Sequence, residues 1–257
     1  MTAFIGLLKK DWQLGKRNLF FVILLQLFIA GGGYALSRYF EIDELMLVAG
    51  VVLIFSHLFG LPAILLTLLN IEGKTQLWLY NPNPASFLLG AKILISTVMY
   101  IISVAMACTL GYLLITNTSF FEHGNLPADT PYIIDLSLIA IGLTYQSLLM
   151  ALFLLFFWTF YHSMKFIKAF RWLLIIIIFS GYSWLEIWIG ELEIIQELKK
   201  TGLVRLSITN YLEMESNGLK VYTKPIDFSI WTVGTSLLMV AIIFLISCKL
   251  LDRKVEV

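Results

Sequence analysis

The chain has 257 residues, of which 59% are apolar and 14% charged; its formal net charge is +1 and its mean hydropathy +0.87. Soluble domains carry about 25% charged residues, so the composition excludes an ordinary soluble domain and indicates an integral membrane protein. The net charge itself says nothing about nucleic acid, but no basic block resembles a DNA-binding arm, so no nucleic acid partner is expected.

The first segment, residues 1–17, predicts an amphipathic helix in the membrane interface. Apolar and aromatic side chains of "FIGLLKKDWQLGKR", among them Phe4, Leu8 and Trp12, gather toward one side, and basic residues supply the other. The alternative is a charged flank that only orients the first span. A cleaved signal peptide is not expected, because the following apolar run is long enough to span and lacks a small-x-small cleavage site.

Apolar runs that can cross a bilayer follow along the chain, since a helix needs about 20 residues to span the hydrocarbon core. The sequence therefore predicts one all-α transmembrane domain, residues 1–257, with six helices. The expected spans are residues 18–37, 45–69, 90–116, 132–160, 168–188 and 229–250.

The fifth span is the shortest, with 14 uncharged residues between Arg171 and Glu186. Either it crosses with Glu186 at the outer headgroup level, or the helix breaks near Ser180–Gly181 and the rest lies along the surface. Lysine and arginine placement then sets the orientation. With the N-terminus inside, inner segments hold 12 of the 18 lysines and arginines and the short outer loops only Arg38, which predicts that both termini are cytoplasmic.

A polar stretch, residues 70–90, separates the second and third spans. "EGKTQLWLY" can form about two helical turns, and "NPNP" stops them, because each proline removes a donor and disfavours helix at the preceding residue. We expect the polar side chains of Glu72, Lys74, Thr75 and Gln76 to stay in water. The larger side chains, Leu77, Trp78 and Tyr80, are available to enter a groove on another protein. An ordinary intracellular loop that folds locally is an equal alternative.

The long loop at residues 189–228 follows the fifth span on the outer side. It begins with an amphipathic helical piece, "WIGELEIIQELKK". "GLVRLSI" and "NGLKVYTKPIDF" then alternate weakly and are expected to pair as short strands across the Asn217–Gly218 turn. Such a loop can cap a pathway, contact cargo or act as a passive lid.

Motifs of enzyme chemistry are missing from the sequence. It contains no HExxH, no GxSxG, no cysteine–histidine cluster with metal-ligand spacing, and no GxxxxGK[ST] phosphate-binding loop. We therefore expect no catalytic residue, metal or cofactor in this chain, and any ATP to be used by another polypeptide. His57, beside the Gly60–Leu61–Pro62 bend, and Glu186 are the ionisable residues that we single out in the membrane; a histidine at such a place is more often a helix-packing donor than a catalyst.

This layout resembles that of the permease subunits of ABC exporters of the ABC-2 class. That class has six spans, cytoplasmic termini, an N-terminal elbow helix and a short coupling helix between the second and third spans. Here "FIGLLKKDWQLGKR" corresponds to the elbow helix and "EGKTQLWLYNPNPASFLLGAK" to the coupling segment. The loop at 189–228 is similar to the short re-entrant or interfacial helices that the class places before its last span.

The resemblance implies an exporter in the bacterial plasma membrane. Two copies of the permease, or two related permeases, would bind two cytoplasmic ATPase subunits that hold ATP and Mg²⁺. The cargo would be an amphipathic or antimicrobial peptide, or another hydrophobic molecule, moved for export or for self-immunity. Membrane lipid would be a further partner of the permease. The residues implied to contact the ATPase are Glu72, Lys74, Gln76, Leu77, Trp78 and Tyr80.

Two other functions remain open from the sequence. One is a six-helix secondary transporter or membrane enzyme in which His57 acts at depth with Ser56 or Asn70. The other is a peptide-sensing or immunity protein whose outer loop binds a peptide without moving it.

Overall fold

The fold is known from a computed structural model, which describes residues 2–75, 83–117, 132–163, 171–200, 203–206, 209–215, 218–223 and 226–254. The chain divides into two compact units. The first comprises Met1–Ile71, Gly90–Ala151 and Ile208–Lys224, and the second Glu72–Leu89, Leu152–Ser207 and Pro225–Val257. Several helices therefore contribute to both units.

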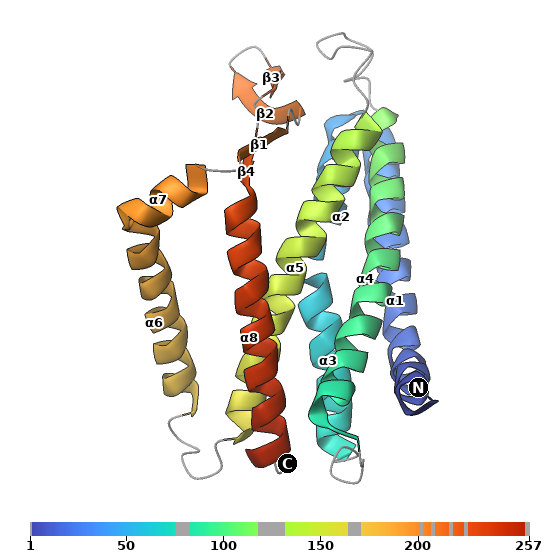
Figure 1. The fold of residues 1–257 in the computed structure, drawn as a ribbon. Coiled ribbons are helices and arrows are strands. Elements are labelled where there is room, and N and C mark those ends of the chain that lie inside the picture. Colours follow the sequence, from blue (N-terminus) through green and yellow to red (C-terminus); the bar gives the residue numbers. More distant parts are fainter. Residues whose placement is uncertain are drawn as a thin grey trace. The chain divides into compact units, whose positions relative to one another are not determined.

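Helices dominate the described residues (Figure 1). They are α1 (Thr2–Phe40), α2 (Glu44–Phe55), the 3₁₀ helix η1 (Ser56–Phe59), α3 (Gly60–Thr75), α4 (Ala85–Thr116), α5 (Tyr132–Ser163), α6 (Arg171–Glu191), α7 (Glu193–Lys200) and α8 (Ile230–Lys254). Four short strands lie between α7 and α8: β1 (Leu203–Leu206), β2 (Thr209–Glu215), β3 (Gly218–Thr223) and β4 (Ile226–Ser229).

Within the described residues, five helical stretches are long and apolar enough to cross a membrane. They are Ala3–Phe40, Glu44–Lys74, Ala85–Thr116, Leu136–Ser163 and Ile230–Asp252. The chain is thus a helical, multi-pass membrane protein, as its composition predicts. The remaining predicted span, the fifth, corresponds to α6, whose apolar stretch covers only Trp172–Gly181.

Helix α6 runs without interruption through Ser180 and Gly181, so the alternative of a break at these residues is wrong. The helix ends at Glu191, and α7 starts at Glu193 after a bend. At 1.5 Å per residue, the 21 residues of α6 reach about 32 Å, close to the roughly 30 Å thickness of a hydrocarbon core. The length of α6 permits a crossing, and the fifth span stays a prediction.

The prediction of a separate elbow helix at residues 1–17 is wrong, because α1 is one helix of 39 residues. Its buried residues recur every four or seven positions along a single stripe: Leu7, Asp11, Gly15, Leu19, Gln26, Ala30 and Ser37. A Cβ on Gly15 would clash with the Met99 side chain of α4, so this part of α1 packs closely on the bundle. Phe4 and Leu8 are half-buried and Trp12 is exposed; their contact with the membrane interface stays a prediction.

The second span is interrupted between α2 and α3, where η1 replaces the α-helix (Figure 1). The sequence predicts a bend at Gly60–Leu61–Pro62, and the irregular turn occurs directly before it. Proline has no N–H, and its ring crowds the carbonyl four residues earlier. The backbone N–H of Leu61 instead donates to Ser147 Oγ of α5 at 3.3 Å.

The core of the first unit lies between α1, α2 and α4. It is a cluster of mostly small and branched side chains: Ala30, Met46, Ala49, Leu53 and Leu114, flanked by Ile29 and Leu110. Glycines bring the backbones close together. Gly33 leaves no room for a Cβ beside Ala49, and a Cβ on Gly111 would lie 3.1 Å from Ile54. Small residues at helix contacts are the usual means of close packing in membranes.

In the second unit, the C-terminal part of α5 packs on α6 through aromatic rings. Phe157 and Phe179 have ring centroids 6.2 Å apart, and Tyr161 and Trp172 5.4 Å apart. The antiparallel pair β1–β4 belongs to the same unit, with Leu203 opposite Ser229.

Strands β2 and β3 form an antiparallel pair in the first unit, with Glu215 opposite Gly218. The predicted pairing across the Asn217–Gly218 turn is confirmed in part, because the strand that pairs with "GLKVYT" is β2, Thr209–Glu215, and not the predicted "GLVRLSI". Asn217 itself lies outside the described residues. "GLVRLSI" contributes β1, which pairs with β4 in "PIDF" and its following serine. The predicted helical piece after the fifth span is divided between the end of α6 and α7.

The three glycines at positions 31–33 provide a matched test of the α1–α2 contact. We expect Gly33→Ala to lower the free energy of unfolding by about 1–3 kcal/mol, because the new methyl group overpacks against Ala49. Gly32→Ala is the control, since nothing lies within 4 Å of a Cβ there. Thermal unfolding of the detergent-solubilised protein measures both, and an equal melting temperature for the two variants would contradict this packing.

Candidate functional site

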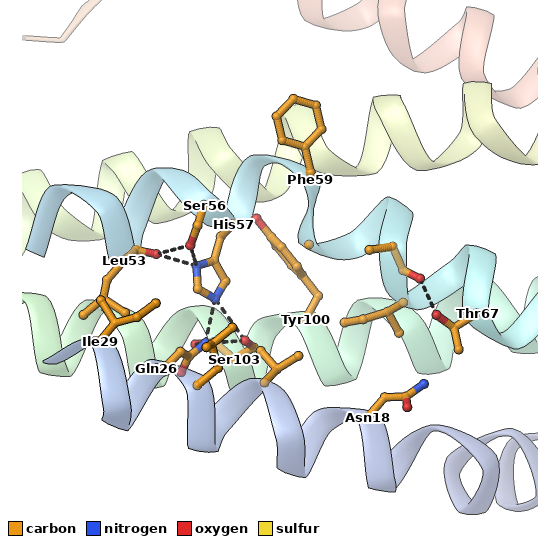
Figure 2. Close-up of a pocket in the computed structure, with 15 residues that line it drawn as sticks. Asn18, Gln26, Ile29, Leu53, Ser56, His57, Phe59, Thr67, Tyr100 and Ser103 are labelled. Atoms are coloured by element: carbon orange, nitrogen blue, oxygen red, sulfur yellow. Dashed lines mark hydrogen bonds between the residues drawn. The ribbon is translucent and has the colours of Figure 1, made fainter. Parts of the chain in front are cut away.

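A cluster of buried polar side chains lies in the middle of the apolar first unit (Figure 2). Gln26 comes from α1, His57 from η1 and Ser103 from α4, and they are 3%, 5% and 2% exposed. His57 Nε2 lies 2.8 Å from Gln26 Nε2 and 2.9 Å from Ser103 Oγ. Gln26 Nε2 also donates to Ser103 Oγ at 2.7 Å. The three helical segments thus meet at one hydrogen-bonded point.

The other imidazole nitrogen fixes the tautomer of His57. Its Nδ1 lies 2.7 Å from the carbonyl oxygen of Leu53, and a carbonyl only accepts, so Nδ1 carries the proton and Nε2 is the acceptor. Ser56 Oγ donates to the same carbonyl at 2.8 Å. Leu53 lies in the last turn of α2, where regular helical bonding ends, so both side chains satisfy a carbonyl at the break.

This tautomer also fixes the Gln26 amide, because Nε2 of Gln26 must face the lone pair of His57. The amide oxygen, Oε1, is then turned away from the imidazole. It is buried and has no hydrogen-bond partner among the described residues. A buried acceptor without a donor is costly in an apolar bundle, so the cluster contains one unused hydrogen-bonding position.

A cavity of about 330 Å³ lies beside this cluster. Its walls come from α1 between Asn18 and Ile29, from the second span between Leu53 and Thr67, and from Tyr100 and Ser103 of α4. Most of these side chains are apolar and none of them is charged. Leu25 and Phe59 line it and are 57% and 60% exposed, so the cavity opens on the outer surface of the helices.

The sequence singled out His57 and Ser56 at this place but missed Gln26 and Ser103. Asn70, the other predicted partner of His57, is exposed and does not line the cavity. Gln26 is the one amide inside the uncharged run at 18–37 apart from Asn18 at its start. A strongly polar residue inside an apolar run was the available signal, because such residues are rare and functional in membranes.

An ion pair that the sequence did not indicate joins α1 to α4. Lys92 Nζ lies 3.1 Å from Asp11 Oδ1, and both side chains are 1% exposed. Lys10 approaches the same carboxylate at 3.8 Å. Buried charges are retained only when they are paired, so this contact fixes the N-terminal part of α1 against the bundle.

The polar stretch between the second and third spans differs in part from the expectation. Helix α3 continues to Thr75, so Glu72 and Lys74 belong to its last turns. Glu72 is 1% exposed, and the expectation that it stays in water is wrong, because it continues the buried stripe of Leu61, Leu65 and Leu68. Lys74 is exposed as expected. Outside the described residues lie Gln76, Leu77, Trp78 and Tyr80.

The far end of this stretch is held by the last helix. The backbone N–H of Ala85, at the start of α4, donates to Asp252 Oδ1 of α8 at 3.0 Å. A carboxylate at a helix N-terminus satisfies a free backbone donor and favours the helix dipole. Glu186 lies in α6, and its side chain is outside the described residues.

Neither the fold nor the cluster points to an established reaction. Among the described residues, no three His, Cys, Asp or Glu side chains are grouped to hold a metal ion. The class of protein is a helical membrane protein with a broken second span and a polar cluster within it. No protein-family model and no solved structure matches the chain.

One curated protein is similar over its whole length. It is "Uncharacterized protein YhcE" from Bacillus subtilis (strain 168), 28% identical over 266 aligned residues that cover all of both chains. The similarity extends from end to end, and the relative's name assigns no activity.

The buried ion pair provides a test of how α1 is held. We expect Lys92→Met to destabilise the protein by about 3–5 kcal/mol, because Asp11 is left buried without this partner. Asp11→Leu combined with Lys92→Met should recover much of the loss, since two apolar side chains replace both charges. Thermal unfolding of the four proteins of the double-mutant cycle measures the coupling. Additive losses would show that the two charges do not act as a pair.

Proposed function

We propose that this chain is the permease subunit of an ATP-driven exporter in the bacterial plasma membrane. The observation that carries the proposal is the short polar stretch between α3 and α4, whose two ends are both attached to the helical bundle. On one side Glu72 is buried at the end of α3, and on the other Ala85 is bonded to Asp252. A stretch held at both ends can transmit a force applied between them.

The connection is short and leads into continuous helices. Only nine residues separate Thr75, the end of α3, from Ala85, the start of α4. Glu72, Ala85 and Asp252 belong to the same compact unit. A cytoplasmic partner that grips residues 76–84 would therefore act on α3 and α4 directly and on α8 through Asp252.

In this proposal both termini face the cytoplasm, as the lysine and arginine distribution supports. Two cytoplasmic ATPase subunits bind and hydrolyse ATP with Mg²⁺, and a second permease copy completes the pathway. The proposed cargo is an amphipathic or antimicrobial peptide or another hydrophobic molecule. The uncharged, largely apolar cavity walls support such cargo over a small ion.

A secondary transporter is the second candidate, and the break at η1 favours it. Transporters of this kind bind substrate near the bilayer midplane, at interrupted helices and buried ionisable groups. His57 lies at such a break. The hydrogen bonds of its Nδ1 and Nε2 nevertheless account for a structural role, and no carboxylate lines the cavity to couple transport to a cation.

Replacement of His57 distinguishes the two candidates. Under the exporter proposal, His57→Gln retains association with the ATPase and ATP-dependent export, because an amide preserves a donor and an acceptor at the break. A secondary transporter that works through His57 would lose transport while the protein still folds. Uptake of cargo into inverted vesicles, whose cytoplasmic face is outside, measures the difference with and without ATP.

The exporter proposal is tested by purification of the chain in mild detergent with its bound subunits. We expect an ATPase with a GxxxxGK[ST] loop to accompany the wild type. Lys74→Ala combined with Trp78→Ala should reduce its recovery at least about tenfold, the effect of removing roughly 1.4 kcal/mol of binding free energy. Glu72 is left unchanged, because its replacement would disturb the buried end of α3.

Trp231→Ala is the matched control, since Trp231 is a partly exposed tryptophan at the start of α8, at the predicted outer end. Its variant should retain the ATPase. If no protein with a phosphate-binding loop accompanies the wild type, the proposal is wrong. Equal loss in the control would show that the effect is not specific to the segment at residues 70–90.

A further inference from the structure

We infer that the cavity beside Gln26, His57 and Ser103 is a binding site for a small neutral amphiphile that carries a hydroxyl group and enters from the lipid side. The inference goes beyond the export proposal, because it concerns the first compact unit alone and requires no ATPase.

The hydrogen bonds of the cluster define what a ligand must supply. His57 Nε2 has one lone pair, so only one of its two neighbours, Gln26 Nε2 and Ser103 Oγ, can donate to it along that direction. If Ser103 donates, the Gln26 N–H groups bond to Ser103 Oγ and to the Ser103 carbonyl at 3.3 Å. If Gln26 donates to His57 Nε2, the Ser103 hydroxyl proton has no acceptor within the cluster. In both arrangements Gln26 Oε1 lacks a donor.

A ligand that completes the cluster therefore brings a hydrogen-bond donor. It is neutral, because no charged residue lines the cavity and an unpaired charge would be costly at this depth. A hydroxyl fits best among neutral groups, since one oxygen both donates and accepts. Such a hydroxyl donates to Gln26 Oε1 and, where Gln26 donates to His57, accepts the Ser103 hydroxyl proton.

The rest of the cavity determines the rest of the ligand. From Gln26 the groove follows α1 back to Asn18, eight residues or about 12 Å along the helix. Its walls there include Val22, Ala63 and Ile64, which suit a hydrocarbon chain. The volume of about 330 Å³ is roughly twice that of a cavity that accepts benzene. A medium-length alkyl chain with a terminal hydroxyl matches this size.

The opening of the cavity selects the route of entry. Leu25, Phe59 and Ala63 line it and are exposed on the outside of the helices. These helices are long enough and apolar enough to lie in a bilayer. A ligand dissolved in the hydrocarbon can therefore enter sideways, without crossing a polar surface.

The experiment uses the full chain in lipid vesicles and a decanol analogue with a photoreactive diazirine in its chain. Cross-links are located by mass spectrometry. Unlabelled decanol and its methyl ether are each added as competitors of the labelling; the ether accepts hydrogen bonds but cannot donate them. We expect labelling of residues 18–29 or 53–67. Decanol should compete roughly twofold to tenfold better than the ether, the range of one neutral hydrogen bond.

Two pairs of proteins make the result specific. Ala63→Trp fills the groove and should abolish labelling, whereas Ala105→Trp, at an exposed alanine of α4 outside the cavity, should leave it unchanged. Gln26→Leu keeps the groove but removes the amide, so labelling should persist while decanol and its ether compete equally.

Labelling that is insensitive to Ala63→Trp, or lost equally in Ala105→Trp, would overturn the binding site. Equal competition by the alcohol and the ether in the wild type would overturn the hydroxyl assignment. Neither result depends on whether an ATPase accompanies the protein, so failure here and failure of the export proposal are separate outcomes.

Discussion

The interruption of the second span is the constraint on which the centre of the first unit depends. In hydrocarbon, every backbone donor and acceptor needs a partner within the protein. Pro62 has no N–H with which to continue the helical bonding, and η1 replaces the α-helix directly before it. His57 and Ser56 satisfy the carbonyl of Leu53, and Ser147 accepts from Leu61. Three polar side chains thus satisfy backbone groups on either side of the 3₁₀ turn.

The placement of His57 at the break explains why the cluster is neutral. Its Nδ1–H donates to Leu53, which leaves a lone pair on Nε2 and draws Gln26 and Ser103 toward it. Deep in the bundle a neutral network costs less than an ion, because desolvation penalises charge most strongly there. Asp11 and Lys92 are charged, and they lie close enough to compensate each other.

The sequence predicted the membrane class and the positions of most helices because long uncharged runs have few alternative explanations. It predicted the bend at Pro62 from the local chemistry of proline and a strand pairing across Asn217–Gly218 from that of Asn-Gly, but it did not single out β2. It was wrong about the break after residue 17, because Lys16 and Arg17 look like the end of an interfacial helix. The buried stripe from Leu7 to Ser37 shows one helix instead.

Other features depended on contacts that a single sequence does not reveal. Gln26 is 77 residues from Ser103 and Asp11 is 81 residues from Lys92 along the chain. Nothing in the local pattern pairs them. Glu72 was expected in water because its neighbours Lys74 and Thr75 are polar, yet its spacing from Leu61, Leu65 and Leu68 places it on the buried face of α3.

The two proposals rest on different compact units, and helices α3, α4 and α5 each contribute residues to both units. Two of these helices, α3 and α4, also carry residues of both proposals. Helix α3 carries Thr67 at the cavity and Glu72 at the polar stretch, about 8 Å apart at 1.5 Å per residue. Helix α4 carries Ala85 and Ser103, about 27 Å apart by the same measure. Thr67 and Glu72 lie within one helix, and so do Ala85 and Ser103, so no loop interrupts either connection. An α-helix changes little in length under load. Under both proposals, any coupling between a ligand in the cavity and a partner on the polar stretch would have to pass along these two helices.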